Sequence, residues 1–559
     1  MFALLEIKNL SISFLQENVK HQVAENISFS LNRGETTALV GESGSGKSVT
    51  ALSLLQLLPK NAVVTGDINY TTQSGTLNLR SLSQRNIQKV RGNKIAMIFQ
   101  EPMTSLNPVY TCGYQVMEVL LQHKKITHRQ ARQQTIALFE QVELPEPAAM
   151  LNRYPHQISG GQKQRVMIAM AISCQPDILI ADEPTTALDV RVQANILQLL
   201  NKLQSQMGMA ILFITHDLGL VADIADNILI AYKGKIVEQG KTSEVLSNPT
   251  NTYTKALLAC RPSAGSKGYK LAVLKDFLAA TENKLVTNTL PAPKKNAILS
   301  LQNITVQFPV STNVFGKAKA FFKAVDDVTL DVFENEVVGL VGESGCGKTT
   351  LGRTILQLIK PSAGKILLND KDITHLSAAQ LRQQRKELQI IFQDPYGSLN
   401  PRLTIGDAIL EPMQVHGLFR NNRQRKEQVV ELLEKVDLEA DQYQRYPHQF
   451  SGGQRQRICI ARALALKPSF LVFDESVSGL DVSVQAQVLN LVNELRATMG
   501  FTAIFISHDL SVVHYISDRI LVMRKGKIVE SGGASDVYHH PQNVYTQQLI
   551  AAIPGKKLG

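Results

Sequence analysis

Hydrophobic and polar positions follow two different periods along this chain. Stretches such as LLEIKNLSISF at residues 4–14 and ETTALVG at 35–41 are short, apolar and rich in β-branched residues, a pattern that predicts β-strands. The segments between such stretches carry helical periodicity. Strands that alternate with helices in this way predict an α/β fold with a mostly parallel sheet flanked by helices.

The whole pattern occurs twice, and the second copy repeats the polar motifs of the first in the same order. GESGSGKS at 41–48 returns as GESGCGKT at 342–349. Each copy continues with a Gln after a short strand, a Ser-Gly-Gly-Gln run, an Asp-Glu pair and a His. A repeat of this length is a duplicated domain rather than a solenoid unit. We therefore predict two tandem α/β nucleotide-binding domains.

The composition between the copies indicates where one domain ends and the next begins. We place the first domain at residues 1–260, a linker at 261–296 and the second domain at 297–559. The ends of the linker are rich in Pro, Gly, Ser and Lys, whereas its LAVLKDFLAA stretch could form a short helix. Each domain is large enough to bury its own core.

Two segments within the domains depart from the strand and helix alternation. Residues 101–158 and 394–450 show helical periodicity with few strand signals, and they predict a helical subdomain inserted into each α/β core. The first copy has extra residues between its glycine-rich loop and its Gln. This surplus lies in 61–90 and predicts a longer surface hairpin.

The glycine-rich loops have the G-x-x-x-x-G-K-[ST] pattern, with a strand before each and a helix after it. Glycines let backbone N–H groups converge on phosphate oxygens at the positive end of the following helix. The lysine supplies a charge to the β- and γ-phosphates, and the Ser or Thr hydroxyl can ligate Mg²⁺. The predicted ATP-binding residues are Gly41, Ser43, Gly44, Gly46, Lys47 and Ser48, with Gly342, Ser344, Gly345, Gly347, Lys348 and Thr349 in the second copy.

An Asp-Glu pair ends an apolar strand in each copy, in ILIADEP and in FLVFDES. Acidic residues commonly end strands, so an Asp-Glu pair indicates a function only where the same domain also contains a phosphate-binding loop. There, Asp182 and Asp474 are predicted to act at the metal ion, and Glu183 and Glu475 to polarise the attacking water.

A Gln and a His follow other strands in both copies. Singly, a polar residue after a strand is usually a loop residue, but the recurrence at matching positions favours a function. We predict that Gln100 and Gln393 reach the metal ion and that His216 and His508 contact the γ-phosphate.

The Ser-Gly-Gly-Gln runs precede apolar helices and so provide further anion-binding helix N-termini. Within a single domain such a motif has no phosphate to bind. If the two domains pack head to tail, each run can close over the nucleotide held by the other domain. The residues involved are Ser159, Gly160, Gly161 and Gln162, which would cover the nucleotide at Lys348, and Ser451, Gly452, Gly453 and Gln454, which would cover that at Lys47.

Composition narrows the setting without identifying a function. With 44% hydrophobic and 19% charged residues the chain is ordinary for a globular protein. No stretch approaches the roughly 18–20 uninterrupted apolar residues that a membrane-spanning helix needs, and no signal peptide is apparent. The net charge of +11 permits contact with anionic membranes or nucleic acid and proves neither. The five cysteines are scattered, which predicts free thiols in a reducing cytosol. We expect the Cys346 thiol, beside a lysine and a helix N-terminus, to have a lowered pKa.

Taken together, these motifs resemble the ATP-binding-cassette (ABC) ATPases, with two cassettes fused in one chain. The strings FQEPMTSLNPVYT and FQDPYGSLNPRLT and the tails NPTNTYTKALL and HPQNVYTQQLI are similar to the peptide-importer branch, which includes the ATPases of microcin C-type peptide and glutathione importers. Ile158, Phe450 and Ser476 depart from the usual pattern, but no catalytic position is lost, so both sites are expected to hydrolyse ATP.

The resemblance implies ATP and Mg²⁺ as cofactors and a peripheral position on the cytoplasmic face of the inner membrane. It further implies two transmembrane permease subunits as partners, joined at the segments after Gln100 and Gln393. A periplasmic solute-binding protein would deliver the cargo. We expect no nucleic acid partner and no direct contact with the transported substrate. Oligopeptides, dipeptides, glutathione, peptide-nucleotide antibiotics, nickel chelates and opines all remain open.

An alternative from another class is a soluble twin-cassette ATPase that acts on ribosomes or nucleic acid, since such proteins can also be basic. The linker lacks a long charged helical hairpin, and no cysteine-rich zinc module interrupts either copy. A twin-cassette sugar importer is disfavoured because both sites here are intact.

Overall fold

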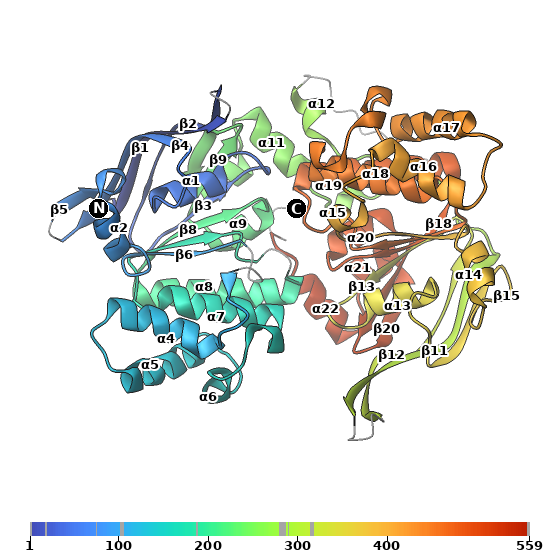
Figure 1. The fold of residues 1–559 in the computed structure, drawn as a ribbon, viewed down its shortest axis with the longest axis horizontal. Coiled ribbons are helices and arrows are strands. Elements are labelled where there is room, and N and C mark those ends of the chain that lie inside the picture. Colours follow the sequence, from blue (N-terminus) through green and yellow to red (C-terminus); the bar gives the residue numbers. More distant parts are fainter. Residues whose placement is uncertain are drawn as a thin grey trace. The chain divides into compact units, whose positions relative to one another are not determined.

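The computed structural model describes residues 3–16, 19–73, 75–100, 105–185, 188–278, 287–288, 290–312 and 318–555. The chain divides into two compact units (Figure 1). The first unit consists mainly of Met1–Leu258, and the second begins at Ala259. Each unit contains one copy of the repeated motifs.

The first unit is built on a six-stranded sheet in the order β10-β9-β3-β8-β7-β6. All neighbouring pairs are parallel except β9 and β10. Every residue of β3, β7 and β8 is buried, which explains why these strands are continuous apolar runs. The bounds are β3 Thr36–Val40, β6 Ile95–Ile98, β7 Ile178–Asp182, β8 Ala210–Thr215, β9 Asn227–Tyr232 and β10 Lys235–Lys241.

A second, antiparallel sheet in this unit has the order β2-β1-β4-β5. Its strands are β1 Leu5–Gln16, β2 Val19–Leu31, β4 Ala62–Thr72 and β5 Gly75–Asn78. Sequence patterns predicted the first of these strands but not that it belongs to a separate sheet. The β4–β5 hairpin confirms the predicted hairpin within 61–90, since its counterpart in the second unit is shorter.

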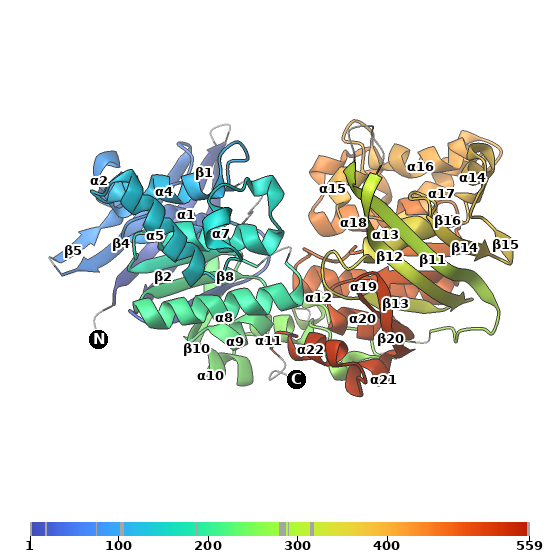
Figure 2. The same cartoon turned by 90° about the horizontal axis from the view of Figure 1, so that it is seen from below.

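The helices of the first copy surround the six-stranded sheet, and α4, α5 and α6 form a group beside α7 (Figures 1 and 2). This group confirms the helical subdomain predicted between Gln100 and the Ser-Gly-Gly-Gln run. The bounds are α1 Lys47–Leu54, α2 Gln84–Val90, α4 Cys112–His123, α5 His128–Gln141, α6 Pro147–Met150, α7 Gly160–Ile172, α8 Val190–Met207, α9 Leu218–Ile224, α10 Thr242–Ser247 and α11 Thr252–Ala259.

The second unit repeats both sheets, with strand orders β16-β17-β18-β13-β19-β20 and β12-β11-β14-β15. The predicted α/β architecture with a mostly parallel sheet is therefore confirmed in both copies. The bounds are β11 Ala297–Thr312, β12 Ala318–Phe333, β13 Val337–Val341, β14 Ala363–Leu368, β15 Lys371–Asp372, β16 Leu388–Ile391, β17 Phe470–Asp474, β18 Thr502–Ile506, β19 Arg519–Arg524 and β20 Lys527–Gly533.

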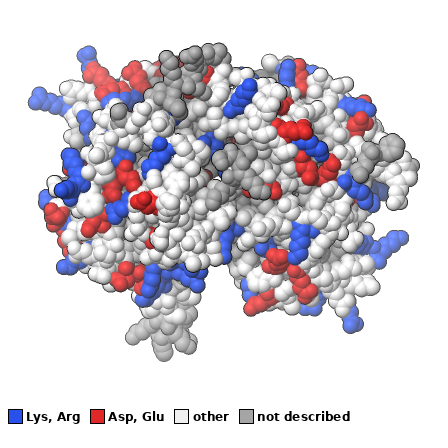
Figure 3. Space-filling view, turned by 180° about the vertical axis from the view of Figure 1, so that it is seen from behind, with Lys and Arg blue, Asp and Glu red and all other residues white. Residues whose placement is uncertain are grey.

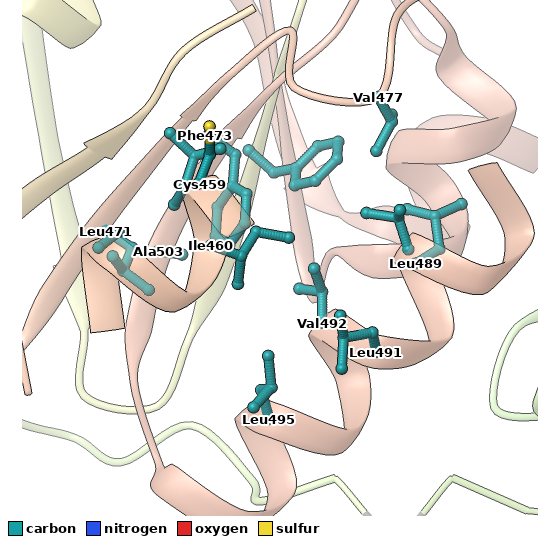
Figure 4. Close-up of a cluster of buried hydrophobic side chains, with 14 of the residues drawn as sticks. Cys459, Ile460, Leu471, Phe473, Val477, Leu489, Leu491, Val492, Leu495 and Ala503 are labelled. Carbon is teal, nitrogen blue, oxygen red and sulfur yellow. The ribbon is translucent and has the colours of Figure 1, made fainter. Parts of the chain in front are cut away.

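The helices of the second unit occur in the same order, and α15, α16 and α17 form its helical subdomain. One of its hydrophobic clusters includes Cys459 of α18, Phe473 of β17 and Val492 of α19, all of them buried (Figure 4). The bounds are α13 Lys348–Ile355, α14 Ala378–Gln384, α15 Pro395–Ser398, α16 Ile405–Val415, α17 Asn422–Lys435, α18 Gly452–Leu464, α19 Val482–Met499, α20 Leu510–Ile516, α21 Ala534–His539 and α22 Val544–Ala551.

Most of the described part of the predicted linker belongs to the second unit. Leu271 is 4% exposed and joins the core there, and the side-chain amide of Asn490 on α19 bonds its backbone N–H and C=O at 2.9 and 2.8 Å. Lys270 forms an ion pair with Glu494 at 2.7 Å. A short helix, α12, covers Leu274–Leu278 within the predicted LAVLKDFLAA stretch. Composition alone did not indicate this packing.

The five cysteines are free and buried, which confirms the prediction of free thiols. Among the described helices, none combines the length and the apolar character needed to cross a membrane. On the face drawn in Figure 3, basic and acidic side chains are interspersed rather than gathered by sign.

Candidate functional site

The first glycine-rich loop joins β3 to α1, and its lysine side chain bonds back to the backbone at the start of the loop. Gly44 and Gly46 have φ of 78° and 91°, a left-handed conformation that side chains rarely tolerate. The buried Lys47 Nζ donates to the backbone oxygens of Gly41 at 2.8 Å and Glu42 at 2.9 Å. The ammonium group is thereby fixed beside the N-terminus of α1, where two positive features can attract a phosphate.

The second loop, between β13 and α13, has the same geometry. Lys348 Nζ donates to Gly342 O at 2.8 Å and to Glu343 O at 3.0 Å. The expectation of a lowered pKa for Cys346 is wrong. Its side chain is 7% exposed, and burial raises the pKa of the thiol more than the nearby Lys348 lowers it.

The hydroxyl that follows each lysine meets the aspartate at the end of a central strand. Ser48 Oγ donates to Asp182 Oδ1 at 3.1 Å, and Thr349 Oγ1 donates to Asp474 Oδ1 at 3.0 Å. Burial raises the pKa of Asp182 to about 6 and raises that of Asp474 as well. A hydroxyl and a carboxylate are oxygen donors of the kind that Mg²⁺ prefers, and Mg²⁺ usually takes only one or two protein carboxylates beside phosphate oxygens.

In the first unit, Glu183 is the point where the predicted Gln and His meet. Gln100 Nε2 donates to Glu183 Oε2 at 3.0 Å, and His216 Nδ1 lies 3.2 Å from Glu183 Oε1. Glu183 itself has φ of 46°, so this carboxylate is carried on strained backbone held by the bond from its N–H to Ile214 O. Three predicted residues from three separate strand ends are thus brought together.

The second unit gathers the same residue types around Glu475. Gln393 Nε2 donates to Glu475 Oε2 at 3.0 Å, while His508 Nδ1 lies 3.7 Å from the same oxygen. Glu475 also has a positive φ, of 49°. The interaction with His508 lowers the pKa of Glu475, so this carboxyl stays ionised at neutral pH.

Each Ser-Gly-Gly-Gln run forms the start of a helix. Ser159 caps α7 and Ser451 caps α18, in each case through a reciprocal pair of bonds with the glutamine three residues later. Among the described residues, the side-chain hydrogen bonds of these serines and glutamines stay within their own motif. Ile158 and Phe450, just before the runs, are buried and pack rather than bind, as expected.

Sequence reasoning missed one contact to each glycine-rich loop. The hydroxyl of Tyr253 on α11 accepts the Glu42 N–H at 3.2 Å, and the hydroxyl of Tyr545 on α22 accepts the Glu343 N–H at 3.1 Å. Both tyrosines belong to the tails used above only as family markers. The recurrence of Asn-x-Tyr-Thr in both copies was the available signal.

Comparisons with known proteins agree with this geometry. A family model described as ABC transporter matches residues 24–186 and 325–478, and one described as the oligopeptide/dipeptide transporter C-terminal region matches 237–284. The glutathione import ATP-binding protein GsiA of Pectobacterium atrosepticum is 46% identical over 558 residues, which cover 98% of this chain and 89% of that protein. Proteins of the same name from Salmonella typhimurium and Escherichia coli are also 46% identical, with the same coverage.

The chain therefore belongs to the ABC transporter family, and each half is an ATP-binding cassette. Within that family it is the ATPase subunit of an importer of the peptide type. This confirms the predicted class and disfavours the alternative of a ribosome- or nucleic-acid-directed ATPase.

The raised pKa of Asp182 predicts an unusual dependence of stability on pH. The native state holds a proton at this carboxyl up to about pH 6, whereas the unfolded chain releases it near pH 4. Because the unfolded state then binds fewer protons, the free energy of unfolding should fall by roughly 2 kcal/mol as the pH rises from 4 to 6. Denaturant unfolding in metal-free buffer measures this, and Asp182→Asn should remove that part of the slope. The exposed Asp67→Asn serves as control, and a slope unchanged by Asp182→Asn contradicts the assignment.

Proposed function

We propose that this subunit couples the hydrolysis of two ATP molecules, each with Mg²⁺, to the import of glutathione or a closely related short peptide. Its partners are two transmembrane permease subunits, fed by a periplasmic solute-binding protein, and its place is the cytoplasmic face of the inner membrane. One observation carries the proposal: both cassettes hold a complete set of lysine, aspartate, glutamate, glutamine and histidine in corresponding places, with the histidine 3.2 Å from Glu183 and 3.7 Å from Glu475. The identity to glutathione import proteins along nearly the whole chain supports the cargo.

We assign phosphate binding to the lysine of each glycine-rich loop, and metal binding to the loop hydroxyl and the aspartate at the strand end. Lys47 and Lys348 hold the β- and γ-phosphates, while Ser48, Asp182, Thr349 and Asp474 hold Mg²⁺ together with Gln100 and Gln393. When bound by these residues, the ion would supply positive charge to the phosphate oxygens. The hydroxyl-to-carboxylate bonds at 3.1 and 3.0 Å support this assignment because they bring two oxygen donors together in each cassette.

Catalysis is assigned to Glu183 and Glu475, which orient and polarise the attacking water. His216 and His508 hold the γ-phosphate and the water geometry. The glutamines, which bond these same carboxylates, link the water site to the segments after Gln100 and Gln393, where we place the permease contacts. A permease that moves this segment can therefore alter the position of the catalytic carboxylate.

We further propose that each ATP is enclosed by both cassettes, which the segment 261–296 joins. The Ser159–Gln162 run covers the nucleotide at Lys348, and the Ser451–Gln454 run covers that at Lys47. Ser159 Oγ accepts the Gln162 N–H and Ser451 Oγ accepts the Gln454 N–H, whereas the two glycine N–H groups of each run lie in the first turn, where a helix offers no carbonyl partner and an anion can bind. ATP then favours the closed state because these contacts exist only there.

Replacement of both glutamates tests the catalytic assignment. The double variant Glu183→Gln and Glu475→Gln should bind ATP as the wild type does but hydrolyse it about 10²–10³-fold more slowly, because the water loses its acceptor. Nucleotide binding and phosphate release measure the two effects. Lys47→Ala with Lys348→Ala is the matched control, in which binding itself should fail. Wild-type hydrolysis by the glutamine variant would refute the role.

Crossed variants test the enclosure of each ATP by both cassettes. Ser451→Arg should abolish vanadate trapping of a photoreactive ATP on the first cassette and leave the label on the second, because the arginine enters only the site at Lys47. Ser159→Arg should show the reverse. Proteolysis in the linker followed by electrophoresis locates the label. Loss of label on the cassette that carries the substitution would contradict the crossed arrangement.

Uptake experiments test the cargo. In a strain that lacks this subunit, uptake of radiolabelled glutathione should fall about tenfold or more, because ATP hydrolysis is then no longer available to drive transport. The Glu183→Gln and Glu475→Gln variant should fail to restore it. Labelled dipeptides, a longer peptide and a nickel chelate are assayed in parallel. If glutathione uptake were normal and uptake of another solute were lost, that solute would be the cargo instead, and the ATPase assignment would stand.

A further inference from the structure

A cation–π contact in the second cassette joins two motifs that are far apart in the sequence. The guanidinium carbon of Arg455 lies 3.7 Å from the ring centroid of Tyr396. Arg455 directly follows Gln454 of the Ser-Gly-Gly-Gln run, and Tyr396 comes three residues after Gln393. The contact therefore connects the segment next to the water site with the start of α18.

Arg455 is held in place for this contact. Its side chain is buried, and its Nε donates to Pro447 O at 2.6 Å. Its Nη1 is buried without a hydrogen-bond partner among the described residues. The ring face of Tyr396 is thus a main source of stabilisation for a largely desolvated charge, the situation in which cation–π attraction is strongest.

Tyr396 belongs to the short helix α15. Other contacts of α15 also connect it to the residue after Gln393 and to α18. Asp394 Oδ1 accepts the Tyr396 N–H at 2.9 Å, directly after Gln393. At the other end, Arg462 of α18 donates to Ser398 O at 2.6 Å. Two arginines of α18 therefore attach α15 to the helix that begins with the Ser-Gly-Gly-Gln run. Tyr396 nevertheless remains 64% exposed, so an outside partner can reach it.

The first cassette cannot build the same attachment. The residues at the positions of Tyr396, Arg455 and Arg462 are Met103, Lys163 and Met170. Met103 lies outside the described residues, but a methionine has no aromatic ring, and neither Lys163 nor Met170 has a planar guanidinium.

We propose that Tyr396 and Arg455 form a positioning pair that transmits permease contact at α15 to the second Ser-Gly-Gly-Gln run. This rests on the proposed function, in which that run covers the ATP at Lys47. Assembly with the permeases then stimulates hydrolysis at the first phosphate loop through this pair. The residues of this cation–π pair occur only in the second cassette, so this route acts on one of the two ATP sites.

Substitutions taken from the first cassette test the pair. Tyr396→Met and Arg455→Lys are each introduced into the full subunit, with Tyr396→Phe as the control that keeps the ring. ATP turnover is measured with MgATP for the free subunit and for the subunit assembled with its two permeases in lipid nanodiscs. Vanadate trapping of photoreactive ATP, followed by cleavage in the linker, reports each cassette separately. No transported solute is required.

Tyr396→Met should reduce the stimulated trapping on the first cassette about fivefold or more, the lower end of typical coupling between sites. Trapping on the second cassette and turnover of the free subunit should not change, and Tyr396→Phe should match the wild type. Arg455→Lys should have the same effect, and the double variant should be no worse than either single variant, because both break one interaction.

Other outcomes overturn the proposal. Equal losses on both cassettes, losses already present in the free subunit, or additive effects of the two substitutions would each show that the pair does not carry the coupling. Unchanged stimulation in Tyr396→Met would do the same. Failure of wild-type subunit to trap nucleotide on either cassette would instead refute the proposed function itself, so the two failures are distinguishable.

Discussion

The bond between a loop hydroxyl and a buried strand-end carboxylate is the constraint on which each cassette depends. Ser48 with Asp182, and Thr349 with Asp474, connect the glycine-rich loop to the strand that precedes Glu183 or Glu475. Both aspartates lie in buried surroundings that raise their pKa, so their charge is costly until a cation and a nucleotide arrive. A bound cation would offset this cost, because its charge favours the ionised carboxylate.

The residue after each aspartate is the glutamate to which the proposed function assigns activation of the water. Glu183 and Glu475 have positive φ, a strained conformation for a non-glycine residue, and each is met by a glutamine and a histidine from neighbouring strand ends. Parallel strands bring their carboxyl ends to one edge of the sheet, so residues distant in sequence converge there. The glutamine is the member of the group that leads outward to the helical subdomain.

The two cassettes are similar in their chemistry and different in their connections. Phosphate loops, aspartates and glutamates match closely, whereas α15 is attached to α18 by two arginines only in the second copy. The described linker region also packs on the second unit through Asn490, where the first copy has Gln198. The residues to which ATP binding is assigned are thus alike in the two copies, while residues that connect each site to the rest of its unit differ.

Local patterns were enough to predict the loops, the strand-end acids, the inserted helices and the hairpin in 61–90, because each depends on residues close together in the chain. The separate antiparallel sheet, the tyrosines that hold each loop and the packing of Leu271 depend on contacts between distant segments. The pKa of Cys346 was misjudged for the same reason: its neighbours in sequence favour the thiolate, but burial by distant residues outweighs them. Residue types determined which chemistry is available, and only tertiary packing decided which groups are desolvated and which of them meet.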